Sequence, residues 1–306
     1  MSSSSRGETP ALPATVRLGD LEVRRLGFGA MQLPGPGVWG EPRDLARAHA
    51  VLRRAGQLGI DFIDTSWYYG PLVANRLIAE VLHPYRAGLV IATKLGGCRT
   101  ADGGWGIALR PDELRAGCEH DLRSLRRDHL DVVHLRWTVG ADVPFGEALG
   151  AMVQLAAEGK IRHLALSNIT RAQLDHALAE GAAIVAVQNL YNVAAGERQL
   201  GGRADSVVAE QELLIDECTA RGIAFLPYFS LAIPGARLPP SPALAAIAEA
   251  RGATISQIAI AWLLARSPVM LPIPGTSSAA HLDENWAARE IALSSEEVAA
   301  IVSARQ

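Results

Sequence analysis

Short apolar runs alternate with amphipathic helical segments along almost the whole chain, and this alternation limits the folds that the chain can adopt. The runs read as buried strands near residues 25–30, 61–64, 89–93, 131–136, 162–166, 184–188, 223–227 and 269–273. The segments with a helical period lie near residues 43–58, 72–82, 111–127, 144–158, 170–180, 206–221, 255–266 and 279–288. Eight strand–helix units predict an α/β fold, a (β/α)8 TIM barrel, with an open doubly wound sheet as the alternative.

Additional elements flank the predicted barrel. The stretch "VRLGDLEVRR" reads as an N-terminal β-hairpin that turns at Gly19 and Asp20. Two extra helices are expected towards the C-terminus, one in "PALAAIAEARG" and one after Ser294. Residues 1–13 read as a flexible tail without the apolar stretch of a signal peptide. Because no linker-like stretch divides residues 14–306, we expect a single domain there.

Composition narrows the classes of function. The 306 residues are 49% hydrophobic and 20% charged, which suits a large buried core. The net charge is −3 with both signs spread evenly, so neither nucleic acid nor a membrane surface is an expected partner. The three cysteines lack a metal-binding spacing and predict a reduced, cytoplasmic protein without a metal site. No apolar run is long enough to span a membrane.

The stretch "GPGVWG", residues 35–40, matches the GxGxxG pattern of dinucleotide-binding Rossmann folds. That fold needs the first glycine at the end of a strand and the last at the start of a helix. Here Leu33 and Pro34 separate the strand from Gly35, and Pro36 lies inside the pattern. We therefore interpret the stretch as a Gly/Pro loop between the first strand and the first helix.

Polar side chains gather where the predicted strands end, which is where barrel enzymes carry their chemistry. Along the chain these ends carry Asp64, Tyr69, Lys94, Arg136, Ser167, Asn168, Gln188, Tyr228, Thr276 and Ser278. Taken singly, Asp64 could cap a helix and Lys94 could be a solvated surface charge. However, Lys94 and Lys160 are the only lysines among the 29 basic residues. An Asp, a Tyr and a rare Lys at neighbouring strand ends together indicate a site.

These residue types suit proton donation to a carbonyl group. A tyrosine titrates near ~10, and a neighbouring lysine is expected to lower that pKa because it favours the phenolate. A carboxylate such as Asp64 would pair with Lys94 and hold it in place. Tyr69 would then act as a general acid near neutral pH, and a hydride source would complete the reduction.

Five stretches resemble the aldo-keto reductase family in order and spacing over nearly the whole chain: "GIDFIDTSWYYG", "VIATK", "LSNIT", "VQNLYN" and "IPGTSSAAHLDEN". The resemblance implies a (β/α)8 barrel that binds a nicotinamide cofactor without a Rossmann domain. It assigns Tyr69 as the acid, Lys94 as its activator and Asp64 as the partner of the lysine. The expected cofactor is NADPH, with NADH as the alternative.

The resemblance also implies a binding site for that cofactor. Its expected residues are Gly29, Met31, Ser167, Asn168, Gln188, Tyr228, Phe229, Ser230, Leu231, Gly275, Thr276, Ser277, Ser278, His281, Glu284 and Asn285. Ser167, Asn168 and Gln188 match carboxamide binders, and Tyr228 matches an aromatic that stacks on the nicotinamide ring. Neither Gly275 nor His281 is a fixed cation for the 2′-phosphate, so the expected preference for NADPH is small.

The strand "LDVVHLRW", residues 130–137, places His134 and Arg136 on one face because they are two residues apart. That face is expected to look into the barrel. Arg136 stands where most of the family carries a catalytic histidine, and an arginine can donate hydrogen bonds but cannot shuttle a proton. His134 lies one pleat deeper and is expected to be a buried histidine with its hydrogen bonds satisfied.

The resemblance implies reduction of an aldehyde or ketone, and it lies nearest to the bacterial branch that includes pyridoxal reductases. The loops 95–107 and 229–240 are expected to select the substrate, with Trp39, Trp67 and Trp105 as pocket walls or as loop packing. The alternative is a regulatory subunit that binds the cofactor and turns over little, because the family includes such subunits.

Overall fold

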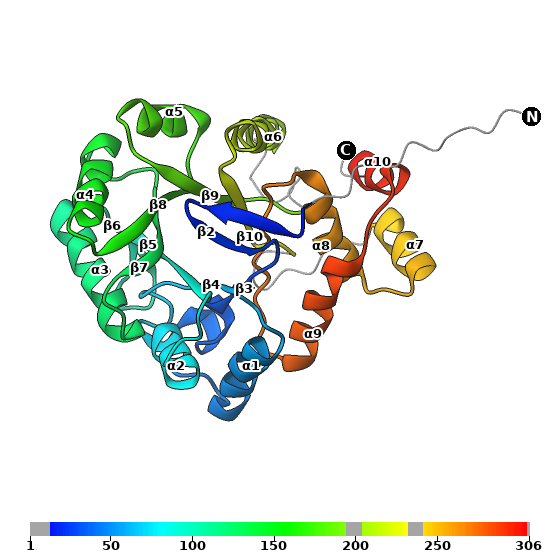
Figure 1. Cartoon of the computed structure of the whole chain (residues 1–306), viewed down its shortest axis with the longest axis horizontal. Coiled ribbons are helices and arrows are strands. Elements are labelled where there is room, and N and C mark those ends of the chain that lie inside the picture. Colours follow the sequence, from blue (N-terminus) through cyan, green and yellow to red (C-terminus); the bar gives the residue numbers. More distant parts are fainter. Residues whose placement is uncertain (1–12, 194–203, 232–240, 305–306) are drawn as a thin grey trace, which may run out of the picture.

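The apolar runs form a curled parallel sheet in the computed structural model, which describes residues 13–193, 204–231 and 241–304 (Figure 1). Its strands are β3 (Phe28–Gly29), β4 (Phe62–Asp64), β5 (Val90–Arg99), β7 (Leu130–Arg136), β8 (Ile161–Ser167), β9 (Ile184–Leu190) and β10 (Ala224–Tyr228). The strands lie side by side in chain order, and each neighbouring pair is parallel. The predicted barrel architecture is confirmed.

The eighth expected strand, residues 269–273, closes the barrel as an extended segment with little regular pairing. The N–H of Phe225 in β10 donates to the carbonyl of Val269 at 2.9 Å, and the N–H of Gly27 donates to the carbonyl of Pro272 at 2.9 Å. A proline has no N–H to give to a ladder, so Pro272 interrupts the pairing of this segment. The segment therefore lies between β10 and β3.

Two of the predicted cofactor residues lie where the closing segment meets β3. Gly29 and Gly275 face each other there. A Cβ atom on Gly29 would lie 2.6 Å from the carbonyl oxygen of Ile273, and one on Gly275 would lie 2.8 Å from the carbonyl oxygen of Gly29. Only glycine allows this close backbone approach. The contacts of both residues are thus those of barrel closure.

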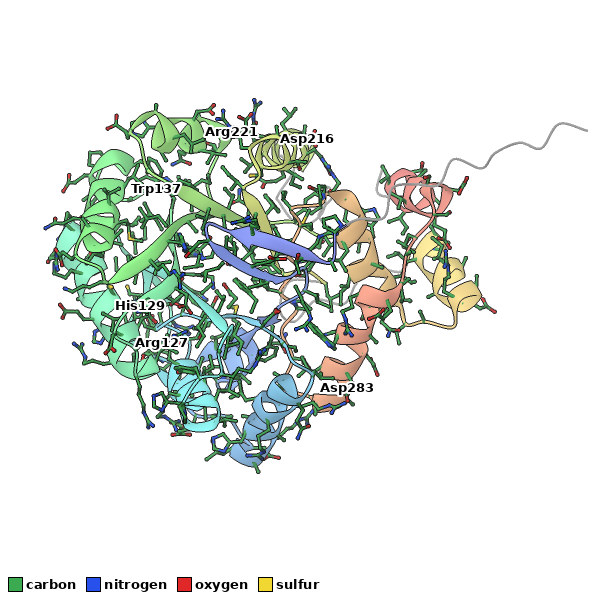
Figure 2. The ribbon with its side chains drawn as sticks, viewed as in Figure 1. Arg127, His129, Trp137, Asp216, Arg221 and Asp283 are labelled. Atoms are coloured by element: carbon green, nitrogen blue, oxygen red, sulfur yellow. The ribbon has the colours of Figure 1, made fainter. Side chains whose placement is uncertain are left out.

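Helices surround the sheet (Figure 1). In the described residues those of the barrel are α1 (Leu45–Gln57), α2 (Val73–Leu82), α3 (Pro111–Leu125), α4 (Phe145–Ala157), α5 (Arg171–Ala179), α6 (Ala204–Arg221), α8 (Ile255–Arg266) and α9 (Ala279–Ala287). The two extra helices expected are α7 (Pro242–Arg251) and α10 (Ser295–Ser303), which pack together outside the ring. Charged side chains such as Asp216 and Arg221 lie at the periphery (Figure 2).

The predicted N-terminal hairpin is formed by β1 (Thr15–Leu18) and β2 (Leu21–Arg24). Asp20 in its turn accepts a hydrogen bond from His163 at 2.6 Å, and His163 lies near the start of β8. The hairpin therefore lies at the amino-terminal end of the strands. The carboxyl-terminal end, where the candidate residues gather, is left to the loops.

The loop expected at 95–107 is largely regular structure. β5 continues to Arg99 and pairs antiparallel with β6 (Trp105–Ala108). Sequence reasoning missed this hairpin because its glycines resemble those of an irregular loop. The "GPGVWG" stretch is a loop, as expected, and contains only the short 3₁₀ helix η2 (Pro36–Val38). Residues 1–12 of the expected tail and 232–240 of the second expected loop lie outside the described residues.

No helix among the described residues has both the length and the apolar character needed to cross a bilayer.

Candidate active site

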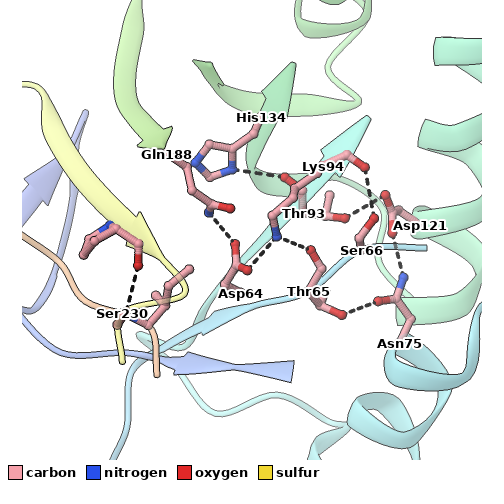
Figure 3. Close-up of polar contacts among 12 residues, drawn as sticks. Asp64, Thr65, Ser66, Asn75, Thr93, Lys94, Asp121, His134, Gln188 and Ser230 are labelled. Carbon is pink, nitrogen blue, oxygen red and sulfur yellow. Dashed lines mark hydrogen bonds and ion pairs between the residues drawn. The ribbon is translucent and has the colours of Figure 1, made fainter. Parts of the chain in front are cut away.

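A buried ion pair lies at the carboxyl end of β4 and near the point where the parallel part of β5 ends (Figure 3). Lys94 Nζ is 2.5 Å from Asp64 Oδ1, and each side chain is 5% exposed. Lys94 Nζ also donates to the carbonyl of Thr65 at 3.0 Å. The second carboxylate oxygen of Asp64 accepts from Gln188 Nε2 at 2.8 Å. The predicted Asp64–Lys94 pairing is thus present, and Gln188 joins it from the far side of the barrel.

Tyr69 lies beside this pair on the turn that follows β4. The residue is 6% exposed, and Lys94 Nζ lies 5.1 Å from the centroid of its ring. Burial and the charge of Asp64 raise the pKa of Tyr69 well above its usual value, and Arg136 opposes that rise. The sequence reasoning expected Lys94 to lower this pKa. That expectation is wrong for this structure, because the phenol is desolvated and Asp64 offsets the charge of the lysine.

Arg136 ends β7 and is half-buried. The register aligns it with Ser167 in β8, and Ser167 in turn with Gln188 in β9. Its Nη1 donates to Thr138 Oγ1 at 3.0 Å. The positive charge lowers the pKa of Tyr69 and that of Tyr228, while burial raises both. Arg136 is therefore near enough to two phenols to stabilise negative charge on either.

His134 lies deeper in the barrel and is completely buried. Its Nδ1 donates to the carbonyl of Thr93 at 3.2 Å (Figure 3). Its Nε2 has no hydrogen-bond partner among the described residues. Desolvation lowers the pKa of His134 to about 4, so the ring is neutral at pH 7. The expectation of a buried histidine is met, but the ring is only half satisfied.

The residues expected to hold the nicotinamide side of a cofactor cluster at the ends of β8, β9 and β10. Asn168 has a left-handed backbone with φ of 62°, and its Nδ2 donates to the carbonyl of Trp137 at 2.9 Å. The hydroxyl of Tyr228 donates to Asn168 Oδ1 at 3.2 Å. Ser167 is buried beside Gln188. The structure brings these four predicted residues together.

The residues after β10 have contacts of their own. Phe229 has a φ of 53°, and its ring meets that of Tyr228 edge-on. Ser230 Oγ donates to the carbonyl of Pro227 at 2.7 Å and accepts from the N–H of Ile273 at 3.2 Å. Ser230 thus ties β10 to the closing segment. Leu231 and Met31 pack as half-buried side chains against the core.

The expected cofactor residues that follow the closing segment lie just before α9 and within it. Thr276 Oγ1 accepts from the N–H of Ser278 at 3.0 Å, and Asn285 is buried. His281 and Glu284 are exposed. The structure adds a cation that sequence reasoning missed: Arg47 on α1, whose Nε donates to the carbonyl of Ser277 at 2.7 Å. Nothing local in the sequence distinguishes this arginine, since its partner lies 230 residues away.

Arg289 follows these residues in the chain, four positions beyond Asn285. It stacks on the ring of Trp286 at 4.5 Å and pairs with Glu290 at 3.1 Å. These contacts engage it on its own helix end, so we do not include it in the cofactor site.

Two of the three predicted pocket tryptophans meet at an arginine that sequence reasoning also missed. The Arg99 guanidinium lies 4.1 Å from the ring centroid of Trp105 and 5.2 Å from that of Trp39. It also donates to the carbonyl of Gly103 at 2.6 Å. Arg99 therefore joins the β5–β6 hairpin to the loop that carries Trp39.

Trp67 lies elsewhere. Its ring stacks on His120 of α3, with centroids 5.1 Å apart. A Cβ atom on Gly117 would approach its indole nitrogen to 2.9 Å. The ring therefore packs against α3, and we leave Trp67 out of the substrate pocket.

Among the described residues, no group of three or more His, Cys, Asp or Glu side chains is arranged to hold a metal ion.

Comparisons with known proteins agree with this geometry. The sequence model of the Aldo/keto reductase family matches residues 25–306. Pyridoxine 4-dehydrogenase of Escherichia coli (strain K12) is 44% identical over 288 residues, which cover 92% of this chain and 95% of that protein. An uncharacterised oxidoreductase of Schizosaccharomyces pombe is 40% identical and covers 92% of this chain and 87% of its own length. A crystal structure of an aldo/keto reductase from Klebsiella pneumoniae with NADP and acetate superposes with a TM-score of 0.75, at 28% identity and 95% coverage of both chains.

Proposed function

This chain is an aldo/keto reductase, and from that premise we propose that it reduces an aromatic hydroxy-aldehyde of the pyridoxal type with NADPH, using Tyr69 as the general acid. The observation that carries the proposal is the cluster of Asp64, Lys94, Tyr69 and Arg136 at the carboxyl end of the barrel. The Asp64–Lys94 pair is buried, and Lys94 Nζ lies over the Tyr69 ring, 5.1 Å from its centroid.

The side chains at this end of the barrel suit a nicotinamide cofactor. Asn168 and Gln188 offer amide donors and acceptors for a carboxamide, and Tyr228 offers an aromatic face beside them. When bound, NADPH supplies the hydride for the reduction. The Klebsiella pneumoniae relative was crystallised with NADP, which supports the same choice here.

For the 2′-phosphate we propose Arg47. Its Nε is taken by Ser277, which leaves the other guanidinium nitrogens beside the N-terminus of α9. A cation and the free N–H groups of a helix start together favour an anion. Arg47 supplies the fixed charge that Gly275 and His281 do not, so NADPH is expected to bind more tightly than NADH.

Tyr69 is proposed to donate its hydroxyl proton to the carbonyl oxygen of the substrate. Its raised pKa keeps that proton in place at neutral pH until the oxygen gains charge. Arg136 is proposed to stabilise the negative charge that the phenolic oxygen then carries. Because arginine stays protonated, Arg136 serves as an electrostatic and orienting group, and the proton comes from Tyr69.

The substrate class follows from the same arginine. A pyridoxal-type aldehyde has a phenolate oxygen on the ring carbon next to the one that carries the aldehyde, and a guanidinium can donate to both oxygens. The relative named pyridoxine 4-dehydrogenase supports this class. Trp39 and Trp105, held together by Arg99, are proposed as the aromatic wall of the pocket.

The test is NADPH oxidation with matched aldehydes. Pyridoxal and isonicotinaldehyde share a pyridine ring and a 4-aldehyde, but only pyridoxal has the phenolic oxygen. We expect turnover with both and a kcat/KM at least tenfold higher for pyridoxal. Turnover of neither aldehyde, nor of 4-nitrobenzaldehyde, by protein that still binds NADP+ would identify a cofactor-binding subunit and overturn the proposal.

A further inference from the structure

A second polar layer lies directly behind the Asp64–Lys94 pair, between the strands and the helices outside them (Figure 3). Successive side chains of a strand point to opposite faces. Asp64 and Lys94 point into the barrel, so their neighbours Thr65 and Thr93 point towards α2 and α3. Both threonines are completely buried.

The two threonines are linked through the helices. Thr65 Oγ1 donates to Asn75 Oδ1 on α2 at 2.8 Å. Asn75 Nδ2 donates to Asp121 Oδ1 on α3 at 2.6 Å, and Thr93 Oγ1 donates to Asp121 Oδ2 at 2.8 Å. Asn75 Nδ2 also lies 3.0 Å from Ser124 Oγ. The bonds run from one strand to the next by way of both helices.

This linkage reaches the catalytic lysine directly. The carbonyl of Thr65 accepts from Lys94 Nζ at 3.0 Å. The N–H of Thr65 donates to the carbonyl of Ala92 in β5 at 2.8 Å. The position of Thr65 therefore fixes one of the two oxygens that hold Lys94 Nζ.

The carboxylate of Asp121 is costly to bury. Its hydrogen-bond partners are neutral groups, namely Thr93, Asn75 and the backbone of Trp67. A buried charge without a paired cation loses several kcal/mol of solvation, and a leucine would fill a helix–strand contact without that cost. The charged or titratable groups that act on it are Lys94 of β5 and Cys118 of its own helix. Because this carboxylate is costly to bury, we expect it to hold neighbouring side chains in place.

We propose that Asp121, through Asn75, Thr65 and Thr93, is a positioning residue that holds Lys94 against Asp64 and Tyr69. The inference rests on the proposed function, since it assigns the network to the reduction at that site. Each oxygen of Asp121 accepts from a donor, so a proton on either oxygen forces the group that donates to it, Thr93 Oγ1 or Asn75 Nδ2, to reorient or to move. Burial raises the pKa of Asp121 to about 7, which places that event near neutral pH.

The variants that test this are Asp121→Asn and Thr93→Val, with Ser124→Ala as the matched control. Ser124→Ala removes another hydroxyl that contacts Asn75, but this hydroxyl has no bond to Thr65 or Thr93. We expect the first two variants to lower kcat for 4-nitrobenzaldehyde about tenfold, with NADP+ affinity within twofold of wild type. In wild type kcat should fall as the pH drops through about 7, and Asp121→Asn should flatten that limb. Ser124→Ala should keep both the rate and the pH profile.

A second measurement is independent of turnover. The chain has only two lysines, so a protein labelled with ¹⁵N-lysine gives two assignable Nζ signals, and Lys160→Arg identifies the one from Lys94. We expect Asp121→Asn and Thr93→Val to shift the Lys94 signal, and Ser124→Ala to leave it unchanged. If both variants unfold at lower temperature but keep the wild-type pH profile and Lys94 signal, the network is structural and the inference is overturned. A wild-type protein that reduces no aldehyde would overturn the proposed function, while the Lys94 signal would still decide whether Asp121 positions the lysine.

Discussion

Gln188 Nε2 donates to Asp64 Oδ2 at 2.8 Å, although the two residues lie 124 positions apart and on strands separated by most of the sheet. Lys94 holds the other oxygen of the same carboxylate at 2.5 Å. Each oxygen of the Asp64 carboxylate therefore accepts a hydrogen bond inside the barrel, one from Lys94 and one from Gln188. This relationship ties a residue expected to contact the cofactor to the charge pair beside Tyr69.

The first prediction concerns the energetic coupling of that pair. Asp64→Asn leaves Lys94 buried without its countercharge, and Lys94→Met leaves Asp64 in the same situation. Each is expected to lower the free energy of unfolding by about 3–5 kcal/mol, the usual cost of breaking a buried ion pair. The double variant should lose less than the sum, because it leaves no unpaired charge. Urea unfolding of all four proteins measures this, and additive losses would show that the two charges are independent.

The second prediction concerns the proton donor. Tyr69→Phe keeps the ring and removes the proton, so kcat for aldehyde reduction should fall by about 10²-fold or more. The affinity for NADP+ should stay within twofold. Tyr68→Phe is the matched control, because Tyr68 is an equally buried neighbour whose ring meets that of Tyr69 edge-on. A Tyr69→Phe enzyme with nearly normal kcat would remove Tyr69 from the role of acid.

The third prediction separates orientation of the substrate from general electrostatics. Arg136→Ala is expected to raise KM for pyridoxal at least tenfold, because the phenolate loses its donor. The effect on isonicotinaldehyde should be several times smaller, and the dissociation constant of NADP+ should not change. Steady-state kinetics with both aldehydes tests this. If Arg136→Ala impaired the reduction of pyridoxal and of isonicotinaldehyde to the same extent, Arg136 would act on the transition state alone and would not recognise the phenolic oxygen.

The regular part of the fold was predictable because it depends on local periodicity. The helical stripes, for example the buried Ala48, Val51, Leu52 and Ala55 of α1, are visible in the sequence and confirmed in the structure. The β5–β6 hairpin was missed because Gly96 and Gly97 break the strand pattern. The closing segment was predicted as a strand. Its pairing is irregular because its prolines have no N–H to donate, and the sequence does not show which residues bond to the segment.

Within the site, the sequence predicted the residues at the strand ends but not the contacts between residues far apart in the chain. Asp64, Lys94 and Arg136 were found because a barrel brings strand ends to one face. The contact between Arg47 and Ser277 joins ordinary residue types across most of the chain, so no local pattern marks it. The pKa of Tyr69 was expected in the wrong direction, because its burial and the charge of Asp64 depend on packing.

The fourth prediction concerns the preference between the two cofactors. Wild type is expected to bind NADP+ about tenfold more tightly than NAD+, a difference of about 1.4 kcal/mol. Arg47→Ala should remove most of that margin by weakening NADP+ binding and should leave NAD+ binding unchanged. Arg53→Ala is the control, since Arg53 is exposed on the same helix. Quenching of tryptophan fluorescence gives the six dissociation constants of the three proteins for the two cofactors, and a margin that survives Arg47→Ala would assign the phosphate to other groups.

The last prediction concerns how stability depends on pH through His134. The folded protein keeps this buried ring neutral, with its pKa lowered from 6.5 to about 4 by desolvation, whereas the unfolded chain exposes it. Between these values unfolding takes up a proton, so the stability that the neutral ring contributes is complete above pH 6.5 and is lost as pH falls to about 4. The lowered pKa corresponds to about 3 kcal/mol over that range.

His134→Gln removes the titration and keeps a side-chain donor for the carbonyl of Thr93. The free energy of unfolding of wild type should therefore fall relative to that of His134→Gln by about 3 kcal/mol between pH 7 and pH 4. Asp121 acts in the opposite sense: its pKa is raised, so its contribution to stability decreases as pH rises towards 7. Comparing the two proteins at each pH cancels the Asp121 contribution, because both contain it. Parallel curves for wild type and His134→Gln would mean that the histidine is protonated in the fold or that water reaches its Nε2.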